Sequence, residues 1–148
     1  MLTVFIQDTA IDSAAALASL EVQGAGAVAS FTGLVRVDDG VTGLELEHYP
    51  GATEAALTRL AQEAMVRWAL SAVAVVHRVG RMVPGDRVVF VGTAAVHRAA
   101  ALEACAFLID RLKTDAPFWK REDRAGEARW VTARAADDEA AERWGSGS

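Results

Sequence analysis

The chain has 148 residues, of which 52% are hydrophobic and 24% charged, as expected for one globular domain. Its net charge of −5 argues against a general nucleic-acid-binding protein but is compatible with a local anion site. Its apolar runs fall short of the roughly 20 residues that span a bilayer, and its single cysteine fits a reducing compartment. We therefore expect a cytoplasmic protein.

Strand and helix signals alternate along the chain. Alternating or β-rich apolar runs predict seven strands, at residues 2–7, 27–36, 44–49, 73–79, 87–95, 118–121 and 129–133. Apolar residues at helical spacing predict four helices, at residues 13–20, 53–68, 97–112 and 135–144. This order predicts an α+β domain with a mainly antiparallel sheet over residues 1–144, followed by a flexible tail at 145–148.

Local signals mark the boundaries of these elements. The first run, which has no basic residue before it, is expected to be a strand and not a signal peptide. Asp12 can cap the first helix, and Pro50 suits the first turn of the second. The third helix must end before Pro117. The polar turn at 38–40 lies between two predicted strands and is typical of a β-hairpin.

Several common catalytic motifs are absent from the sequence. There is no phosphate-binding P-loop, and the glycine-containing run at 24–29 precedes a predicted strand where a dinucleotide-binding motif needs a helix. The three histidines, His48, His77 and His97, lack metal-ligand spacing, so we expect no metal site. Cys105 lies among apolar helix residues, which favours a buried structural thiol.

The use of lysine is more informative. Of the 15 basic residues, only Lys113 and Lys120 are lysines. A lysine amine can lose its proton when it is desolvated or lies near other cations, whereas arginine stays charged. Two interpretations of Lys113 remain open at this point. It is either a proton-transfer group in a pocket or a solvated helix-end cation paired with Asp110.

A basic pair, His97-Arg98, opens the third predicted helix. Because a helix N-terminus already carries partial positive charge, this pair requires either a bound anion or side chains that point into solvent. Arg36 ends a predicted strand, and Lys120 follows the aromatic pair Phe118-Trp119, which either lines a pocket or fills the core. Together these cations favour a phosphate-binding pocket.

Six segments of the sequence resemble the catalytic (large) subunit of molybdopterin synthase. They are Phe-Thr-Gly-Leu-Val-Arg at 31–36, Leu-Glu-His-Tyr-Pro-Gly at 46–51, His-Arg-Val-Gly at 77–80, Pro-Gly-Asp at 84–86, His-Arg at 97–98 and Leu-Lys-Thr-Asp-Ala-Pro-Phe-Trp-Lys-Arg-Glu at 112–122. The last segment is highly specific, and the resemblance extends from Val4 to Trp144 in family order.

The resemblance implies a fold, a reaction and a partner. The fold is an α/β hammerhead with added antiparallel strands. The reaction converts cyclic pyranopterin monophosphate into molybdopterin by adding two sulfurs as a dithiolene. The sulfur arrives as a thiocarboxylate on the C-terminal Gly-Gly tail of a small ubiquitin-like subunit. Two large subunits form a homodimer within a heterotetramer, and no cofactor is expected.

The resemblance also implies roles for individual residues. Lys113 matches the principal catalytic lysine and Lys120 the second, so we expect Lys113 to act as acid, base or amine nucleophile and Lys120 to orient the reactants. Arginine and histidine would hold the phosphate, with His97 and Arg98 reaching the site from the neighbouring large subunit. The implied substrate-binding residues are Leu34 (through its backbone only), Val35, Arg36, His97, Arg98, Lys113, Lys120, Arg121, Glu122 and Arg134.

Two other classes of function remain open from the sequence. One is a non-catalytic binding protein that kept the pocket and lost turnover, against which the intact lysines and His-Arg pair count. The other is an enzyme that acts on a different phosphorylated metabolite and needs no protein sulfur donor.

Overall fold

The computed structural model describes residues 1–36, 41–124 and 127–131, and in these ranges it contains two four-stranded sheets and three helices. The helices are α1 (Ser13–Ala18), α2 (Ala52–Trp68) and α3 (Arg98–Asp115). The strands are β1 (Leu2–Gln7), β2 (Ala27–Leu34), β3 (Val41–His48), β4 (Ala72–Arg78), β5 (Gly80–Met82), β6 (Arg87–Ala95), β7 (Phe118–Arg124) and β8 (Glu127–Val131). The predicted α+β class is therefore confirmed.

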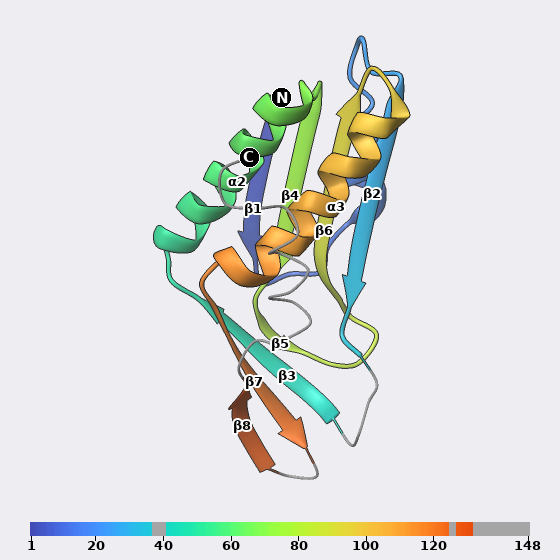
Figure 1. Ribbon diagram of the computed structural model, residues 1–148. Coiled ribbons are helices and arrows are strands. Elements are labelled where there is room, and N and C mark those ends of the chain that lie inside the picture. Colours follow the sequence, from blue (N-terminus) through green and yellow to red (C-terminus); the bar gives the residue numbers. More distant parts are fainter. Residues whose placement is uncertain (37–40, 125–126, 132–148) are drawn as a thin grey trace.

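The first sheet has the strand order β1-β4-β6-β2 and carries the main core. Only β1 and β4 pair in parallel, and the other pairs are antiparallel, as predicted. Helices α2 and α3 lie on one face of this sheet (Figure 1). The central strand β4 is buried from Ala72 to His77 because α2 and α3 cover one face while a smaller cluster that includes Leu20 and Phe90 covers the other.

The second sheet has the order β5-β3-β7-β8 and lies beyond the ends of α2 and α3 (Figure 1). Its small core consists of Val35, Leu44, Leu46 and Met82. Phe118 of β7 packs against this core and also against the main core. The start of β7 therefore lies at the junction of the two sheets.

The predicted hairpin of β2 and β3 is wrong. β2 pairs along its whole length with β6, from Ala27 opposite Ala95 to Leu34 opposite Arg87, whereas β3 pairs with β5 and β7. The two strands bury different faces, because Ala27 and Ala29 pack under the helices while Leu44 and Leu46 form the core of the second sheet. The predicted turn at 38–40 lies outside the described residues.

Most other predicted boundaries agree with the structure to within a few residues. Asp12 caps α1 by accepting a hydrogen bond from Ala15 N at 3.0 Å, as predicted. Pro50, however, lies before the cap of α2, because the chain turns at Gly51 with a φ of +86° that favours glycine. The short strand β5 was not predicted, and the predicted helix at 135–144 lies outside the described residues. No described helix has both the length and the apolar character needed to cross a membrane.

One buried hydroxyl joins α2 to the start of β7 and the end of β3. Thr53 is fully buried, and its Oγ1 donates a hydrogen bond to Pro117 O at 2.8 Å and accepts one from Tyr49 N at 3.0 Å. Both backbone groups belong to segments that enter or leave the second sheet. The Thr53 hydroxyl therefore helps to fix that sheet against the helices.

We expect Thr53→Val to lower the free energy of unfolding by about 2–4 kcal/mol, because it leaves two backbone groups without their partner. Urea unfolding followed by circular dichroism measures this loss. The matched control is Thr58→Val in the same helix, where Thr58 is half-buried, with an expected change within about 0.5 kcal/mol. Equal losses in the two variants would contradict the role of the Thr53 hydroxyl.

Candidate active site

Lys113 and Lys120 lie on either side of the turn that joins α3 to β7. Lys113 is an exposed residue in the last turn of α3, where a cation interacts favourably with the helix dipole. The helix ends at Asp115, and the extended residue Ala116 leads through Pro117 into β7. Strand β4, which begins four residues after the end of α2, runs toward the same junction, so that two sheets and a helix meet here (Figure 1).

Lys120 and Glu122 lie on the inner face of the second sheet. They stand opposite Leu46 and Leu44, whose side chains are buried in the small core. Lys120 Nζ is 3.2 Å from Glu122 Oε1, and only 5% of the Glu122 side chain is exposed. A carboxylate so deeply buried requires a cationic partner, and Lys120 supplies one.

Strand alternation places Arg121 on the opposite face of the sheet from Lys120 and Glu122. Arg121 lies 4.0 Å from Glu45 there, in a partly exposed ion pair. Trp119 shares this outer face and makes an edge-to-face contact with Tyr49, with ring centroids 3.9 Å apart. Consecutive residues of the Lys-Arg-Glu run are therefore not brought together, and only Lys120 and Glu122 meet.

His77, near the end of β4, lies close enough to Lys113 for the two to interact electrostatically, and it was not predicted as a site residue. Its ring is buried and stacks on Phe118, with centroids 4.1 Å apart and an interplanar angle of 26°. The pKa of His77 is lowered to about 4, mainly by burial and also by the positive charge of Lys113, although a hydrogen bond to Arg78 O raises it. The signal in the sequence was a single histidine that ends an otherwise apolar strand.

The predicted site residues at the end of β2 face different ways. Val35 is buried in the small core, and its backbone N–H donates to Asp86 O at 2.8 Å while its carbonyl accepts from Gly85 N at 2.9 Å. Leu34 and Arg36, on either side of it, are exposed.

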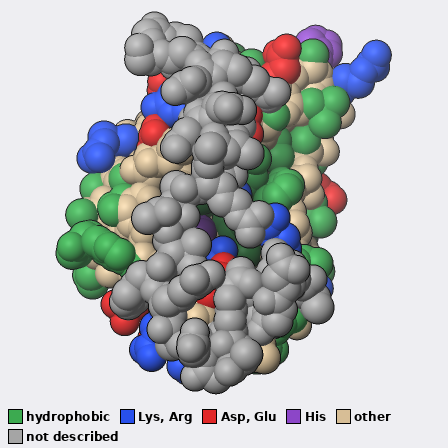
Figure 2. All heavy atoms as spheres, turned by 60° about the horizontal axis from the view of Figure 1, so that its bottom comes forward, with side chains coloured by type: hydrophobic (Ala, Val, Ile, Leu, Met, Phe, Trp, Pro, Cys, Tyr) green, Lys and Arg blue, Asp and Glu red, His purple; other side chains and the backbone are tan. Residues whose placement is uncertain are grey.

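Figure 2 shows histidine, basic and acidic side-chain atoms close together near the centre of the face that carries the second sheet.

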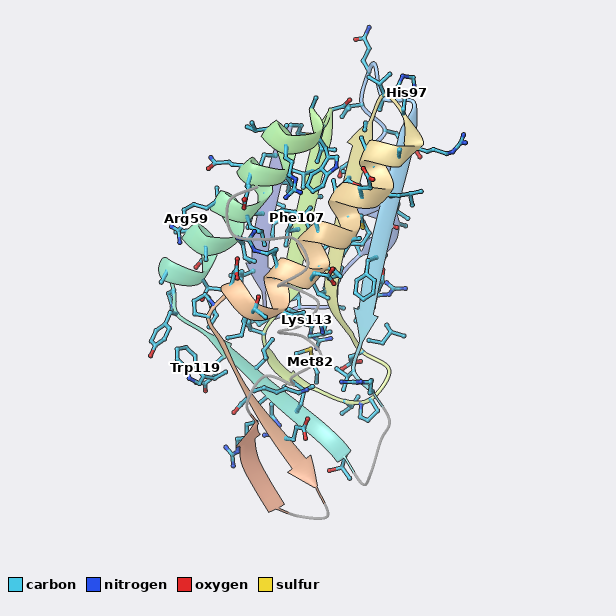
Figure 3. All side chains as sticks on the ribbon, in the orientation of Figure 1. Arg59, Met82, His97, Phe107, Lys113 and Trp119 are labelled. Atoms are coloured by element: carbon cyan, nitrogen blue, oxygen red, sulfur yellow. The ribbon has the colours of Figure 1, made fainter. Side chains whose placement is uncertain are left out.

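His97 and Arg98 are far from the lysines within one chain. His97 caps the N-terminus of α3 and both residues are exposed, whereas Lys113 lies in the last turn of the same helix (Figure 3). Arg98 and Lys113 are separated by about four helical turns, or roughly 22 Å. A single chain therefore does not bring the basic pair to Lys113. Arg134 lies outside the described residues.

The remaining candidates from the sequence are the Cys105 thiol and the side chains that could bind a metal ion. Cys105 is buried, its Sγ lies 3.8 Å from Val91 O, and burial raises the pKa of its thiol to about 11. Such a thiol is inert at neutral pH. Within the described ranges, no group of three or more histidine, cysteine, aspartate or glutamate side chains is arranged to hold a metal ion.

Comparisons with known proteins identify the family. The MoaE protein family model matches residues 6–115, which is more than half of the chain. The chain belongs to the MoaE family. The molybdopterin synthase catalytic subunit of Pseudomonas aeruginosa is 49% identical over 97% of this chain and 99% of its own length. The subunit of the same name from Escherichia coli is 53% identical over 80% and 81%.

Solved structures of MoaE-family proteins have the same fold. A molybdopterin biosynthesis MoaE protein from Burkholderia ambifaria matches with a TM-score of 0.85 and 49% identity, over 99% of both chains. A molybdopterin synthase structure from Staphylococcus aureus matches with a TM-score of 0.81 and 29% identity, over 86% of this chain and 95% of that one. The α+β architecture and the family resemblance seen in the sequence are thus confirmed.

The buried His77 makes stability depend on pH. Its folded-state pKa of about 4 lies below the ordinary histidine value of 6.5, so the unfolded chain binds a proton first as the pH falls. We therefore expect the free energy of unfolding to fall by about 2 kcal/mol from this group between pH 7 and pH 5. Urea unfolding at a series of pH values measures this slope.

His77→Phe removes the titrating group, and its unfolding free energy should vary less over this pH range than that of the parent chain. His97→Asn, which removes an exposed histidine at the far end of α3, should keep the parent slope. An unchanged slope in His77→Phe would show that other groups control the acid sensitivity.

Proposed function

We propose that this chain is the catalytic subunit of molybdopterin synthase. It transfers sulfur from the thiocarboxylated C-terminus of a small ubiquitin-like subunit to cyclic pyranopterin monophosphate, and forms the dithiolene of molybdopterin. The near full-length identity to catalytic subunits of that name supports the assignment. The single structural observation that carries it is the position of Lys113 and Lys120 on either side of the α3–β7 turn, above a buried carboxylate.

Each sulfur transfer forms a carbon–sulfur bond on the substrate and breaks the bond between that sulfur and the acyl carbon of the tail. Water adds its oxygen to the acyl carbon, and the tail of the small subunit is released as a carboxylate. Two thiocarboxylates are consumed for each dithiolene, and the cyclic phosphate opens to a terminal phosphate. The reaction thus requires proton transfer at the pterin side chain and stabilisation of several anionic groups.

The two lysines have surroundings suited to different tasks. Lys120 is held by the buried Glu122, so its ammonium is fixed in position and suits the orientation of the phosphate or the thiocarboxylate. Lys113 is exposed at a helix end beside the uncharged ring of His77, where substrate can reach its amine. We assign proton transfer or transient nucleophilic attack to Lys113 and orientation to Lys120.

Further residues are proposed to bind the anionic substrate. Arg36 is exposed at the end of β2, next to the turn at Gly85-Asp86 that joins the two sheets. The full proposed set is Leu34, Val35, Arg36, His97, Arg98, Lys113, Lys120, Arg121, Glu122 and Arg134. Within it, Arg121 lies on the outer face of the second sheet, which suits contact with the small subunit better than contact with the pterin.

The length of α3 supports a site shared between two copies of the chain. Because His97 and Arg98 lie about four turns from Lys113, they can reach an active site only in a neighbouring large subunit. We propose a homodimer that binds one small subunit at each end. We further propose a cytoplasmic location and one domain over residues 1–144, in keeping with the single buried Cys105.

Lys113→Arg tests the chemical role of the principal lysine. It keeps a positive charge but removes the accessible neutral amine, so we expect kcat to fall by about 100-fold or more. The measurement is product formation from cyclic pyranopterin monophosphate and thiocarboxylated small subunit. Arg59→Ala removes an exposed cation from α2 and should retain parent activity. Substantial activity in Lys113→Arg would exclude an acid–base or nucleophilic role.

Mixing two inactive variants tests the shared site. A heterodimer of Lys113→Ala and Arg98→Ala chains contains one site with both residues intact if Arg98 acts on the neighbouring subunit. Random exchange at equal concentrations should then restore about a quarter of parent activity, because half of the dimers are mixed and each has one intact site. Activity that stays at the level of the separate variants would place Arg98 in the site of its own chain.

A further inference from the structure

His77 is a polar residue in a place where an apolar one would pack more simply. It ends the β4 run Ala72–Val76, in which every residue is buried. Only 6% of His77 is exposed, whereas His48 is half-buried and His97 is exposed. Burying a polar ring is unfavourable unless its polar atoms have partners. The contacts of the ring therefore bear on what it does.

Two contacts fix the orientation of the ring. One nitrogen, Nδ1, lies 3.0 Å from Arg78 O. Because a carbonyl oxygen can only accept, the hydrogen is assigned to Nδ1, and Nε2 carries the lone pair in the neutral ring. One ring face stacks on Phe118 at 4.1 Å. The imidazole is thus attached to its own strand by a hydrogen bond and to β7 by its face.

The charged groups around the ring come from three elements. Lys113 approaches from α3, and its positive charge disfavours a second cation at His77. His48 of β3 acts in the same direction when it is protonated. His48 itself lies 3.9 Å from Glu54 of α2. Burial is the largest effect and holds the pKa of His77 near 4, so its ring is uncharged at neutral pH.

The stack connects the ring to the proposed catalytic strand. Phe118 is the first residue of β7 and lies two positions before Lys120, so the two side chains stand on the same face of the strand. Phe118 also packs against the main core under the helices and against the small core of the second sheet. A change in the surface under Phe118 would therefore act on the strand that carries Lys120, next to the helix end that carries Lys113.

We propose that His77 is a positioning residue of the sulfur-transfer site, whose uncharged ring supports Phe118 and thereby sets Lys120 relative to Lys113. The inference rests on the proposed function and adds to it a residue that touches neither reactant. A displacement of about 1 Å in a catalytic group can lower the rate by about 100-fold, so a support of this kind affects turnover directly.

Two substitutions separate the ring from its hydrogen bond. His77→Phe keeps an uncharged aromatic face under Phe118 and loses the donor to Arg78 O. His77→Asn keeps a donor near the Nδ1 position and loses the aromatic face. Leu20→Val is the control for general destabilisation, because Leu20 is fully buried in the cluster on the other face of the first sheet.

The measurements are kcat and KM with thiocarboxylated small subunit as the varied substrate, corrected for the folded fraction. We expect His77→Asn to lower kcat by about tenfold or more with KM within about twofold, and His77→Phe to keep kcat within about threefold. Leu20→Val should keep the parent kcat for each folded molecule. Parallel losses in the two His77 variants, or a loss confined to KM, would overturn the proposal.

Hydrogen exchange provides a second readout that does not depend on turnover. Loss of the supporting ring should speed amide exchange at residues 118–122 by about tenfold in His77→Asn but not in His77→Phe. Equal protection of β7 in both variants would overturn the positioning role even if the chain were inactive. A parent chain that makes no product, with β7 exchange changed as expected, would instead overturn the proposed function and leave His77 as the support of β7.

Discussion

The turn between α3 and β7 is the constraint on which the candidate site depends. It places Lys113 at the end of a helix and Lys120 on a strand of a different sheet, with Ala116 and Pro117 between them. The Thr53 hydroxyl bonds Pro117 O and Tyr49 N, so one buried group holds this turn and the end of β3 together. The relative position of the two lysines is thus set by packing and hydrogen bonding and not by a flexible loop.

The alternation of side chains along β7 decides which of its charged residues face the core and which face outward. The chain is acidic overall, yet Lys120, Arg121 and Glu122 follow one another in β7. Alternation sends Lys120 and Glu122 inward to form a partly buried ion pair and sends Arg121 outward to the half-buried Glu45. An inner ion pair is weakly screened and orients its lysine, whereas an outer pair contributes little to stability and leaves a surface charge available to a partner.

Sequence patterns predicted the local elements better than their partners. Periodicity and caps act within a few residues, so β1, β6 and the cap at Asp12 were predicted correctly. The pairing of β2 with β6 depends on which strand faces are covered by α2 and α3, and a turn signal at 38–40 carries no such information. The importance of His77 depends on a stack with Phe118, which is 41 positions away in the chain.

The family resemblance gave the candidate residues, and the structure divides them into groups with different physical possibilities. Lys120 and Glu122 form an ion pair in β7, and Lys113 lies across the α3–β7 turn, close enough for its charge to act on His77. His97 and Arg98 lie at the other end of α3. A rigid helix of this length prevents one chain from closing the proposed anion site alone. In a two-fold assembly, the distance between the His97-Arg98 pair and Lys113 lets each copy supply this pair to the site of the other copy. One interface then completes both anion sites.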